Sequence, residues 1–269
     1  MKNLLGCCVG SPEKLSFEEN MRLIKEVGFD ATLLDGGDTH NIDEEAAICR
    51  KYGLVIDNIH APFGGLNCMW YEGDEGTAYT DKLAKVITTA ARLDIPHVII
   101  HCTAGGVPEE PHGSAIGIER FGRLIGLGKS LGIKLAFENL EYPEMLGLIM
   151  DTFKNEDIGF CWDTGHEALC TPGMRFIPLY GDRLCCTHLH DNYGASYSKV
   201  PIVHGDCHMI PLDGALDFKR IMHDIRSVDY KGVLMLECSA RGDLGTYYDL
   251  DARGYYERCY AALTRLSEM

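Results

Sequence analysis

The chain has 269 residues, of which 46% are hydrophobic and 24% are charged, and its formal net charge is −15. That length is typical of one α/β barrel of roughly 250 residues, so residues 1–269 are predicted to form a single domain with a sizeable core. The negative charge argues against nucleic acid as a partner, and no apolar run approaches the roughly 20 residues that cross a bilayer, so no membrane partner is predicted.

Short apolar runs recur along the chain and fit buried strands. Near-continuous apolar strands are typical of a parallel sheet that is covered on both faces. The predicted strands are Leu4–Val9, Ala31–Leu34, Val55–Ile59, His97–Ile100, Lys134–Phe137, Ile158–Trp162, Leu184–Thr187 and Gly232–Leu236.

Amphipathic stretches with helix signals lie between and after these runs. Ser16-Phe-Glu-Glu19 is a capping box that opens a helix to about Val27, and the helix Asp43–Tyr52 ends before Gly53, a favourable residue after a helix. The other predicted helices span about Thr80–Leu93, Ser114–Leu131, Pro143–Phe153, Met174–Tyr180, Asp217–Val228 and Asp249–Leu266. Strands that alternate with helices in this way predict an α/β fold, a single (β/α)₈ TIM barrel.

The main alternative fold is an open Rossmann-type sheet. No Gly-x-Gly-x-x-Gly turn follows the first predicted strand, and eight repeats favour a closed barrel. The longest irregular stretches are Pro62–Gly76, Cys102–Gly113 and Asp191–Gly214. They follow strands three, four and seven, so they are predicted to lie over the same mouth of the barrel.

Twelve cysteines raise the question of disulfide bonds. The sequence has no Cys-x-x-Cys pair, and its N-terminal apolar run is too short for an export signal and fits a strand better. Several cysteines, such as Cys161 and Cys186, fall inside apolar runs. The interpretation is buried, reduced thiols in a cytoplasmic protein, without a metal-binding or nucleophilic role.

Ionisable side chains occur where six consecutive predicted strands end. They are His60, His101, Glu138, Asp163, His188 and Glu237. Any one of them could be a solvated residue at the point where burial stops. Parallel strands bring their carboxyl ends to one mouth, however, so six in succession predict a shared site. Burial of Glu138 and Glu237 would cost several kcal/mol unless each carboxylate is paired or bound to a metal.

Carboxylates and imidazole are ligands that suit Mn²⁺, Zn²⁺, Co²⁺ or Mg²⁺. Without a thiolate, the set favours a catalytic site with open positions over a structural zinc site. Asp163-Thr-Gly-His166 leaves its strand through a predicted turn, so both side chains can face the mouth. Asp206-Cys-His208 places alternate residues of an extended segment on one face.

The motifs that carry a family resemblance are, in chain order, Asn58-Ile-His60-Ala-Pro-Phe, Ile100-His101, Phe137-Glu138-Asn139, Cys161-Trp-Asp163-Thr-Gly-His166, Thr187-His188-Leu-His-Asp191-Asn, Asp206-Cys-His208 and Leu236-Glu237. Their order and spacing resemble the xylose-isomerase-like TIM-barrel superfamily, which includes sugar isomerases, ketose 3-epimerases, inosose dehydratases and endonuclease IV. The resemblance covers nearly the whole chain. It implies that Glu138, Asp163, His188 and Glu237 bind one divalent metal ion.

The resemblance leaves the number of metal ions open, because endonuclease IV uses a trinuclear zinc cluster. The positions that match its additional ligands are His60, His101, His166, Asp206 and His208. The first two would join Glu138 around a second metal, and the last three would hold a third. Many sugar-acting relatives use several of these residues to hold substrate hydroxyls instead.

Two details bear on this comparison. His188-Leu-His190 offers two imidazoles, so His190 is an alternative ligand to His188. Many relatives have Pro-Gly-x-Gly after the Asp-x-His pair, whereas this chain has Pro211-Leu212-Asp-Gly214, and the loop backbone is expected to differ. Relatives are often dimers or tetramers, which makes a homo-oligomer a further expectation.

The leading hypothesis is a metal-dependent isomerase or epimerase acting on a small-molecule sugar or sugar phosphate. Glu138 and Glu237 would lie on opposite sides of the substrate, one removing the proton α to the carbonyl and the other returning a proton, while the metal stabilises an enediolate. The first alternative is a trinuclear-zinc apurinic endonuclease, which the nine candidate ligands favour and the acidic charge disfavours. The second alternative is a non-catalytic barrel that binds a sugar or metal as a sensor.

Overall fold

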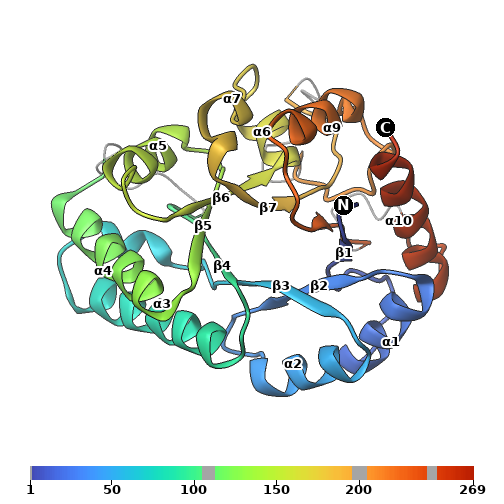
Figure 1. Cartoon of the computed structure of the whole chain (residues 1–269), viewed down its shortest axis with the longest axis horizontal. Coiled ribbons are helices and arrows are strands. Elements are labelled where there is room, and N and C mark those ends of the chain that lie inside the picture. Colours follow the sequence, from blue (N-terminus) through green and yellow to red (C-terminus); the bar gives the residue numbers. More distant parts are fainter. Residues whose placement is uncertain (1, 105–112, 196–204, 241–246) are drawn as a thin grey trace.

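The computed structural model describes residues 2–104, 113–195, 205–240 and 247–269, and Figure 1 shows a ring of strands with helices around it. The strands are β1 Leu5–Cys7, β2 Ala31–Asp35, β3 Val55–His60, β4 His97–Ile100, β5 Lys134–Glu138, β6 Gly159–Asp163, β7 Leu184–His188 and β8 Leu234–Leu236. All are parallel, and their order in the sheet is β7-β6-β5-β4-β3-β2-β1-β8. Hydrogen bonds from Leu189 N to Met235 O (2.8 Å) and from Glu237 N to Leu189 O (3.2 Å) join the two edges. The predicted (β/α)₈ TIM barrel is confirmed.

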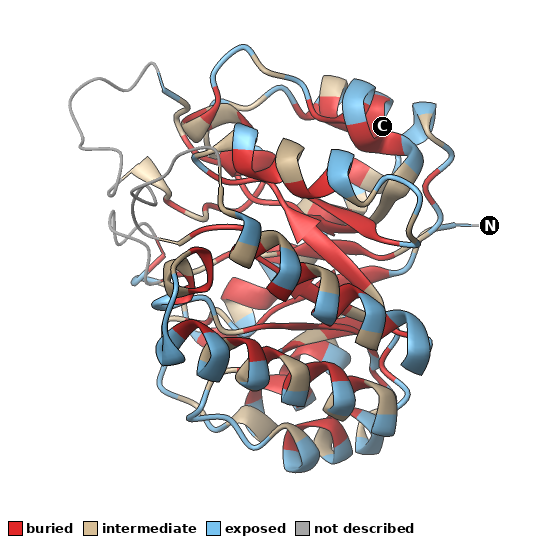
Figure 2. Cartoon of the chain, turned by 90° about the vertical axis from the view of Figure 1, so that its left-hand side faces the viewer, coloured by how far each residue is buried: buried red, intermediate tan, exposed pale blue. Residues whose placement is uncertain are grey.

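The helices are α1 Phe17–Val27, α2 Ile42–Lys51, α3 Asp74–Arg92, α4 Ala115–Leu131, α5 Pro143–Thr152, α6 Thr164–Cys170, α7 Ile177–Tyr180, α9 Phe218–Ser227 and α10 Ala252–Ser267, with 3₁₀ turns η1 Leu66–Trp70 and η2 Gly181–Arg183. Figure 2 shows that the helices turn their buried faces toward the strands and their exposed faces outward. No helix in the described ranges combines the length and apolar composition that a membrane crossing requires.

Apolar side chains fill the space on both sides of the strands. The larger cluster, with Phe137 and Phe160 among its buried residues, packs between the barrel and its helices. Smaller clusters of strand residues occupy the barrel interior, and one of them consists of Ile99, Ala136, Cys161 and Cys186. Within the described residues no disulfide bond joins any of the cysteines, as the sequence predicts. The packed interior leaves the carboxyl ends of the strands as the place for a site.

Two helix predictions are wrong in detail. The helix predicted from Thr80 begins earlier, at Asp74. The sequence did not indicate this first turn because Gly76 lowers its helix propensity. A glycine is needed there because the Arg120 guanidinium lies 2.3 Å from where a Cβ would stand. The predicted turn after Asp163 is instead the start of α6, with the Asp163 carboxylate accepting a hydrogen bond from His166 N (2.6 Å) as its N-cap. This cap brings His166 back to the strand end.

Other predicted boundaries agree to within a few residues. The capping box at Ser16 and the end of its helix at Val27 are confirmed. The helix predicted over Met174–Tyr180 is shorter and spans Ile177–Tyr180, and part of the stretch Pro62–Gly76 forms η1. Residues 105–112 and 196–204, within the other two long stretches, lie outside the described residues.

Candidate metal centre at the barrel mouth

The carboxyl ends of the strands open into two adjoining cavities of about 540 and 180 Å³. Both cavities are lined by His60, Phe63, His208 and Glu237, so they are parts of one hollow at the mouth. The smaller one also reaches Glu138. Residues far apart in the sequence therefore meet around a space large enough for a small molecule.

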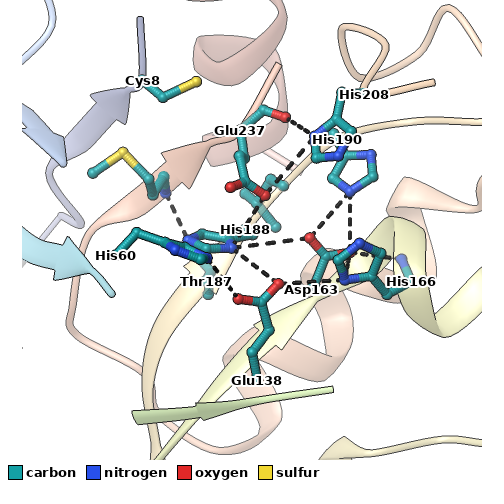
Figure 3. Close-up of polar contacts among 12 residues, drawn as sticks. Cys8, His60, Glu138, Asp163, His166, Thr187, His188, His190, His208 and Glu237 are labelled. Atoms are coloured by element: carbon teal, nitrogen blue, oxygen red, sulfur yellow. Dashed lines mark hydrogen bonds and ion pairs between the residues drawn. The ribbon is translucent and has the colours of Figure 1, made fainter. Parts of the chain in front are cut away.

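His188, the last residue of β7, lies at the centre of the cluster, and Figure 3 shows the neighbouring carboxylates turned toward it. Its Nδ1 is 3.3 Å from Glu138 Oε1, 3.2 Å from Glu237 Oε2 and 4.0 Å from Asp163 Oδ2. Glu138, Asp163 and His188 are buried, while the side chain of Glu237 is 22% exposed and opens to the cavity. The four residues that the sequence predicts as ligands of one metal thus lie together.

His190 occupies a different place from His188. Its Nε2 lies 3.0 Å from both carboxylate oxygens of Asp163, and Figure 3 shows the two imidazoles on different sides of that residue. A Cβ at residue 165 would come within 2.0 Å of the His190 ring, so Gly165 leaves room for this contact. The geometry favours His188 as the imidazole that faces both glutamates.

The two oxygens of Glu138 face different imidazoles. Oε2 lies 3.4 Å from His60 Nε2 and 3.3 Å from His101 Nε2, while Oε1 lies 3.3 Å from His166 Nδ1 as well as from His188 Nδ1. Phe63 stacks on His101 with ring centroids 4.6 Å apart. The sequence motif contains Phe63 but gave no reason to assign it this contact. Glu138 therefore connects the central cluster to the pair His60 and His101.

A third group forms around Asp206. Its Oδ2 lies 3.2 Å from His166 Nε2 and 3.1 Å from His208 Nε2. His208 Nδ1 donates a hydrogen bond to Glu237 O (2.7 Å), which fixes the ring, and the residue has a φ of 42°. A non-glycine residue in this region is strained, and such residues concentrate at functional sites.

Charge balance within the cluster depends on the pairing of imidazoles with carboxylates. Burial opposes ionisation of Glu138, but His188 and His101 hold its pKa well below the ordinary value. Burial also opposes a charged His188, but the Cys161 thiol and the carboxylates of Glu237 and Glu138 hold its pKa well above the ordinary value. For His208, burial is outweighed by the hydrogen bond and charge of Asp206, which raise its pKa to about 9.

Several buried polar atoms of the cluster have no hydrogen-bond partner within the described residues: Glu138 Oε2, His101 Nε2, both ring nitrogens of His188 and Asp206 Oδ1. Buried polar atoms usually have a partner. Ligand atoms lie within 4.8 Å of one another in each of the groups His60–His101–Glu138, His60–His188–Glu237 and His166–His190–Asp206–His208. Carboxylate and imidazole atoms that lack a hydrogen-bond partner fit the coordination of a divalent metal ion.

A loop that follows β7 carries Asp206 and His208, and Asp191 anchors its far end. The Asp191 carboxylate accepts hydrogen bonds from the backbone N–H groups of Asn192, Leu212, Gly214 and Leu216 at 2.9 to 3.0 Å. Leu212 has a φ of 78°, a left-handed conformation that glycine adopts without strain and leucine does not. Sequence reasoning noted Asp191 and Leu212 but missed this anchoring role.

A family model described as the xylose isomerase-like TIM barrel matches residues 12–258. The chain belongs to this family. It is 33% identical over 138 residues to the uncharacterised protein y4fM of Sinorhizobium fredii (strain NBRC 101917 / NGR234). That match covers 51% of this chain and 39% of y4fM, so the matched part spans well under half of that relative's length.

Solved structures of the xylose isomerase-like type share the fold at low identity. The apo form of the 3-keto-D-glucoside 4-epimerase YcjR from E. coli has a TM-score of 0.73 and 16% identity, with 100% of both chains covered. The IOLI protein with a binding zinc atom has a TM-score of 0.74 and 16% identity, with 100% of this chain and 98% of that chain covered. Sugar epimerases and a zinc-binding protein are therefore built on the same barrel.

Proposed function

We propose that this protein is a divalent-metal-dependent isomerase or epimerase that acts on a sugar or sugar phosphate. The observation that carries the proposal is the position of two carboxylates. Glu138 ends β5 and Glu237 follows β8, and both line the smaller cavity. A substrate in that cavity would be within reach of both, which is the arrangement that proton removal and return require.

Glu138, Asp163, His188 and Glu237 would hold the central metal ion. The unpartnered atoms of Glu138 and His188 support this assignment, and the zinc named for the IOLI structure is consistent with it. When bound, a divalent metal supplies Lewis-acid stabilisation of the negative charge that develops on the substrate oxygens.

Glu237 is the better candidate for the group that removes the proton α to the carbonyl. Its side chain is exposed to both cavities, whereas Glu138 is almost fully buried between imidazoles. Glu138, whose pKa is held low, would first take up a proton from the adjacent His166 imidazole, whose Nδ1 lies 3.3 Å from Oε1, and would then return it to the substrate from its own side of the cavity. His101 and His166 line the smaller cavity and would orient substrate hydroxyls by hydrogen bonds.

The experiment uses Glu237→Gln, which keeps the shape of the side chain and removes its basic oxygen. In a panel of ketoses and ketose phosphates in D₂O, the wild type should incorporate solvent deuterium next to the carbonyl. The variant should lose incorporation by about 10²-fold or more, the usual contribution of a general base. Glu268→Gln, an exposed glutamate near the C-terminus, is the matched control and should behave as the wild type. Incorporation at the wild-type rate by Glu237→Gln would sink the assignment.

One observation favours a second candidate, a trinuclear-zinc apurinic endonuclease. All nine residues that match its ligand pattern meet at the mouth in three connected groups around Glu138, His188 and Asp206. Three metals in such a cluster would activate a hydroxide for attack on a phosphodiester. Nicking of abasic duplex DNA that is lost on chelation, with about three zinc ions per chain, would decide for this function.

A further inference from the structure

A second polar group lies inside the barrel, away from the mouth. It comprises Asp57 of β3, His97 at the start of β4 and Cys186 in β7. Each residue offers one ligand atom, and the three atoms lie within 4.8 Å of one another. His97 precedes His101 by four residues, about 13 Å of strand, and Cys186 precedes His188 by two, about 7 Å, so this group lies below the mouth cluster in the barrel.

The carboxylate of Asp57 is buried without a fixed positive charge beside it. The residue is 5% exposed, and in the described part of the chain no lysine or arginine forms an ion pair with it. Its nearest imidazole nitrogen is His97 Nδ1 at 3.9 Å from Oδ1, beyond hydrogen-bond distance. Burial raises the pKa of Asp57, with His97 and Asn58 acting against this effect. A bound cation would supply the missing positive charge.

Hydrogen bonds restrain the imidazole and the carboxylate of the group. His97 Nδ1 donates to the backbone oxygen of Asp57 (3.0 Å), which leaves the lone pair of Nε2 available. Asn58 Nδ2 donates to Asp57 Oδ2 (2.9 Å), while Asn58 Oδ1 is buried with no partner among the described residues. Metal-binding histidines commonly donate their other N–H to a carbonyl, and ligating carboxylates are hydrogen-bonded in turn.

We propose that Asp57, His97 and Cys186 bind a zinc ion that stabilises the barrel interior. A carboxylate, an imidazole and a thiolate form a zinc donor set, and water can reach the fourth position beside His97, whose side chain is 21% exposed. Zinc-bound atoms lie closer together than 4.8 Å, so the ligands would close by up to about 1 Å on binding. On binding, Cys186 loses its proton to water and becomes the thiolate ligand.

The location gives this ion a structural role. β3 and β4 are neighbours in the sheet, whereas β7 is three strands beyond β4, so the ion would connect distant parts of the wall. It does not touch the cavity at the mouth, so the proposal is independent of the proposed function.

The test replaces zinc with Co²⁺ in the full-length protein, because a thiolate ligand gives Co²⁺ a near-ultraviolet charge-transfer band. The wild type should show this band, and Cys186→Ser should lose it and hold one zinc ion fewer per chain. Cys49→Ser, the matched control, removes a buried thiol on α2 and should keep both band and zinc content. Asp57→Asn and His97→Gln should lower the zinc content in the same way and provide further tests if the serine variant does not fold.

Absence of the band in the wild type would overturn the proposal. Retention of the band in Cys186→Ser, or its loss only in Cys49→Ser, would assign the thiolate elsewhere and would also overturn it. If the wild type shows the band but turns over no sugar, the proposed function fails and the zinc proposal stands.

Discussion

The residues at the barrel mouth are positioned in two different ways. Glu138, Asp163 and His188 are the last residues of β5, β6 and β7, and the hydrogen-bonded register of the sheet fixes them. Asp206 and His208 lie on the loop after β7, and a single buried carboxylate, that of Asp191, anchors the backbone beyond them. The strand-end residues depend on the whole barrel. The loop residues depend on a few local contacts, namely the Asp191 carboxylate, the backbone pairing of Asp191 with Met209 and the hydrogen bond from His208 to Glu237 O.

This difference indicates which part of the site can change without unfolding the protein. The strand-end residues, defined here as Glu138, Asp163 and His188, are three of the four residues proposed to hold the central metal ion. The loop residues, defined as Asp206 and His208, belong to the third group, which the proposed one-metal site does not need and the trinuclear alternative does. The two regions can therefore be separated by substitutions that affect only one of them.

The largest effect is expected for Asp191→Ala, which should release the loop. Four backbone N–H groups would lose their acceptor, and the free energy of unfolding should fall by about 3–5 kcal/mol. Urea unfolding measures this change, and metal analysis should show the central ion retained if the strand-end residues are independent of the loop. Asp217→Ala, which removes the exposed cap of α9 in the same segment, is the control and should cost only about 1 kcal/mol. A loss for Asp191→Ala no larger than that of the control would refute the anchoring role.

An intermediate effect is expected for Gly165→Ala, which affects the strand-end residues instead. The added Cβ would stand 2.0 Å from the His190 ring, so the ring must leave its contact with Asp163. Metal affinity should fall about 10- to 100-fold, as it does when a residue that orients a ligand is lost. Competition with a chelator measures the affinity, and Gly126→Ala, on α4 with nothing near its Cβ, is the control. Equal affinities of the two variants would show that His190 does not position Asp163.

The sequence predicted the strand-end residues well because strand periodicity and the rule of parallel strands determine where they lie. It could not predict the anchoring by Asp191, since Leu212, Gly214 and Leu216 are 21 to 25 residues further along the chain and reach it only in the fold. The helix α6 was missed because Thr164–Cys170 is short and contains Gly165, so only its cap reveals it. The single-domain assignment and the roles of individual ligands stay predictions.

The smallest effect is expected for Leu212→Gly, which relieves strain in the loop without touching the strand-end residues. Leu212 has a φ of 78°, a conformation that costs a non-glycine residue roughly 1–2 kcal/mol. Part of this gain is lost to the greater freedom of glycine in the unfolded chain, so the net stabilisation should be about 0.5 kcal/mol. Leu212→Ala keeps the strained backbone and should give no stabilisation in the same urea unfolding experiment. Equal stability of the two variants would mean that the hydrogen bond from Leu212 N to Asp191, rather than side-chain strain, sets the energy of this turn.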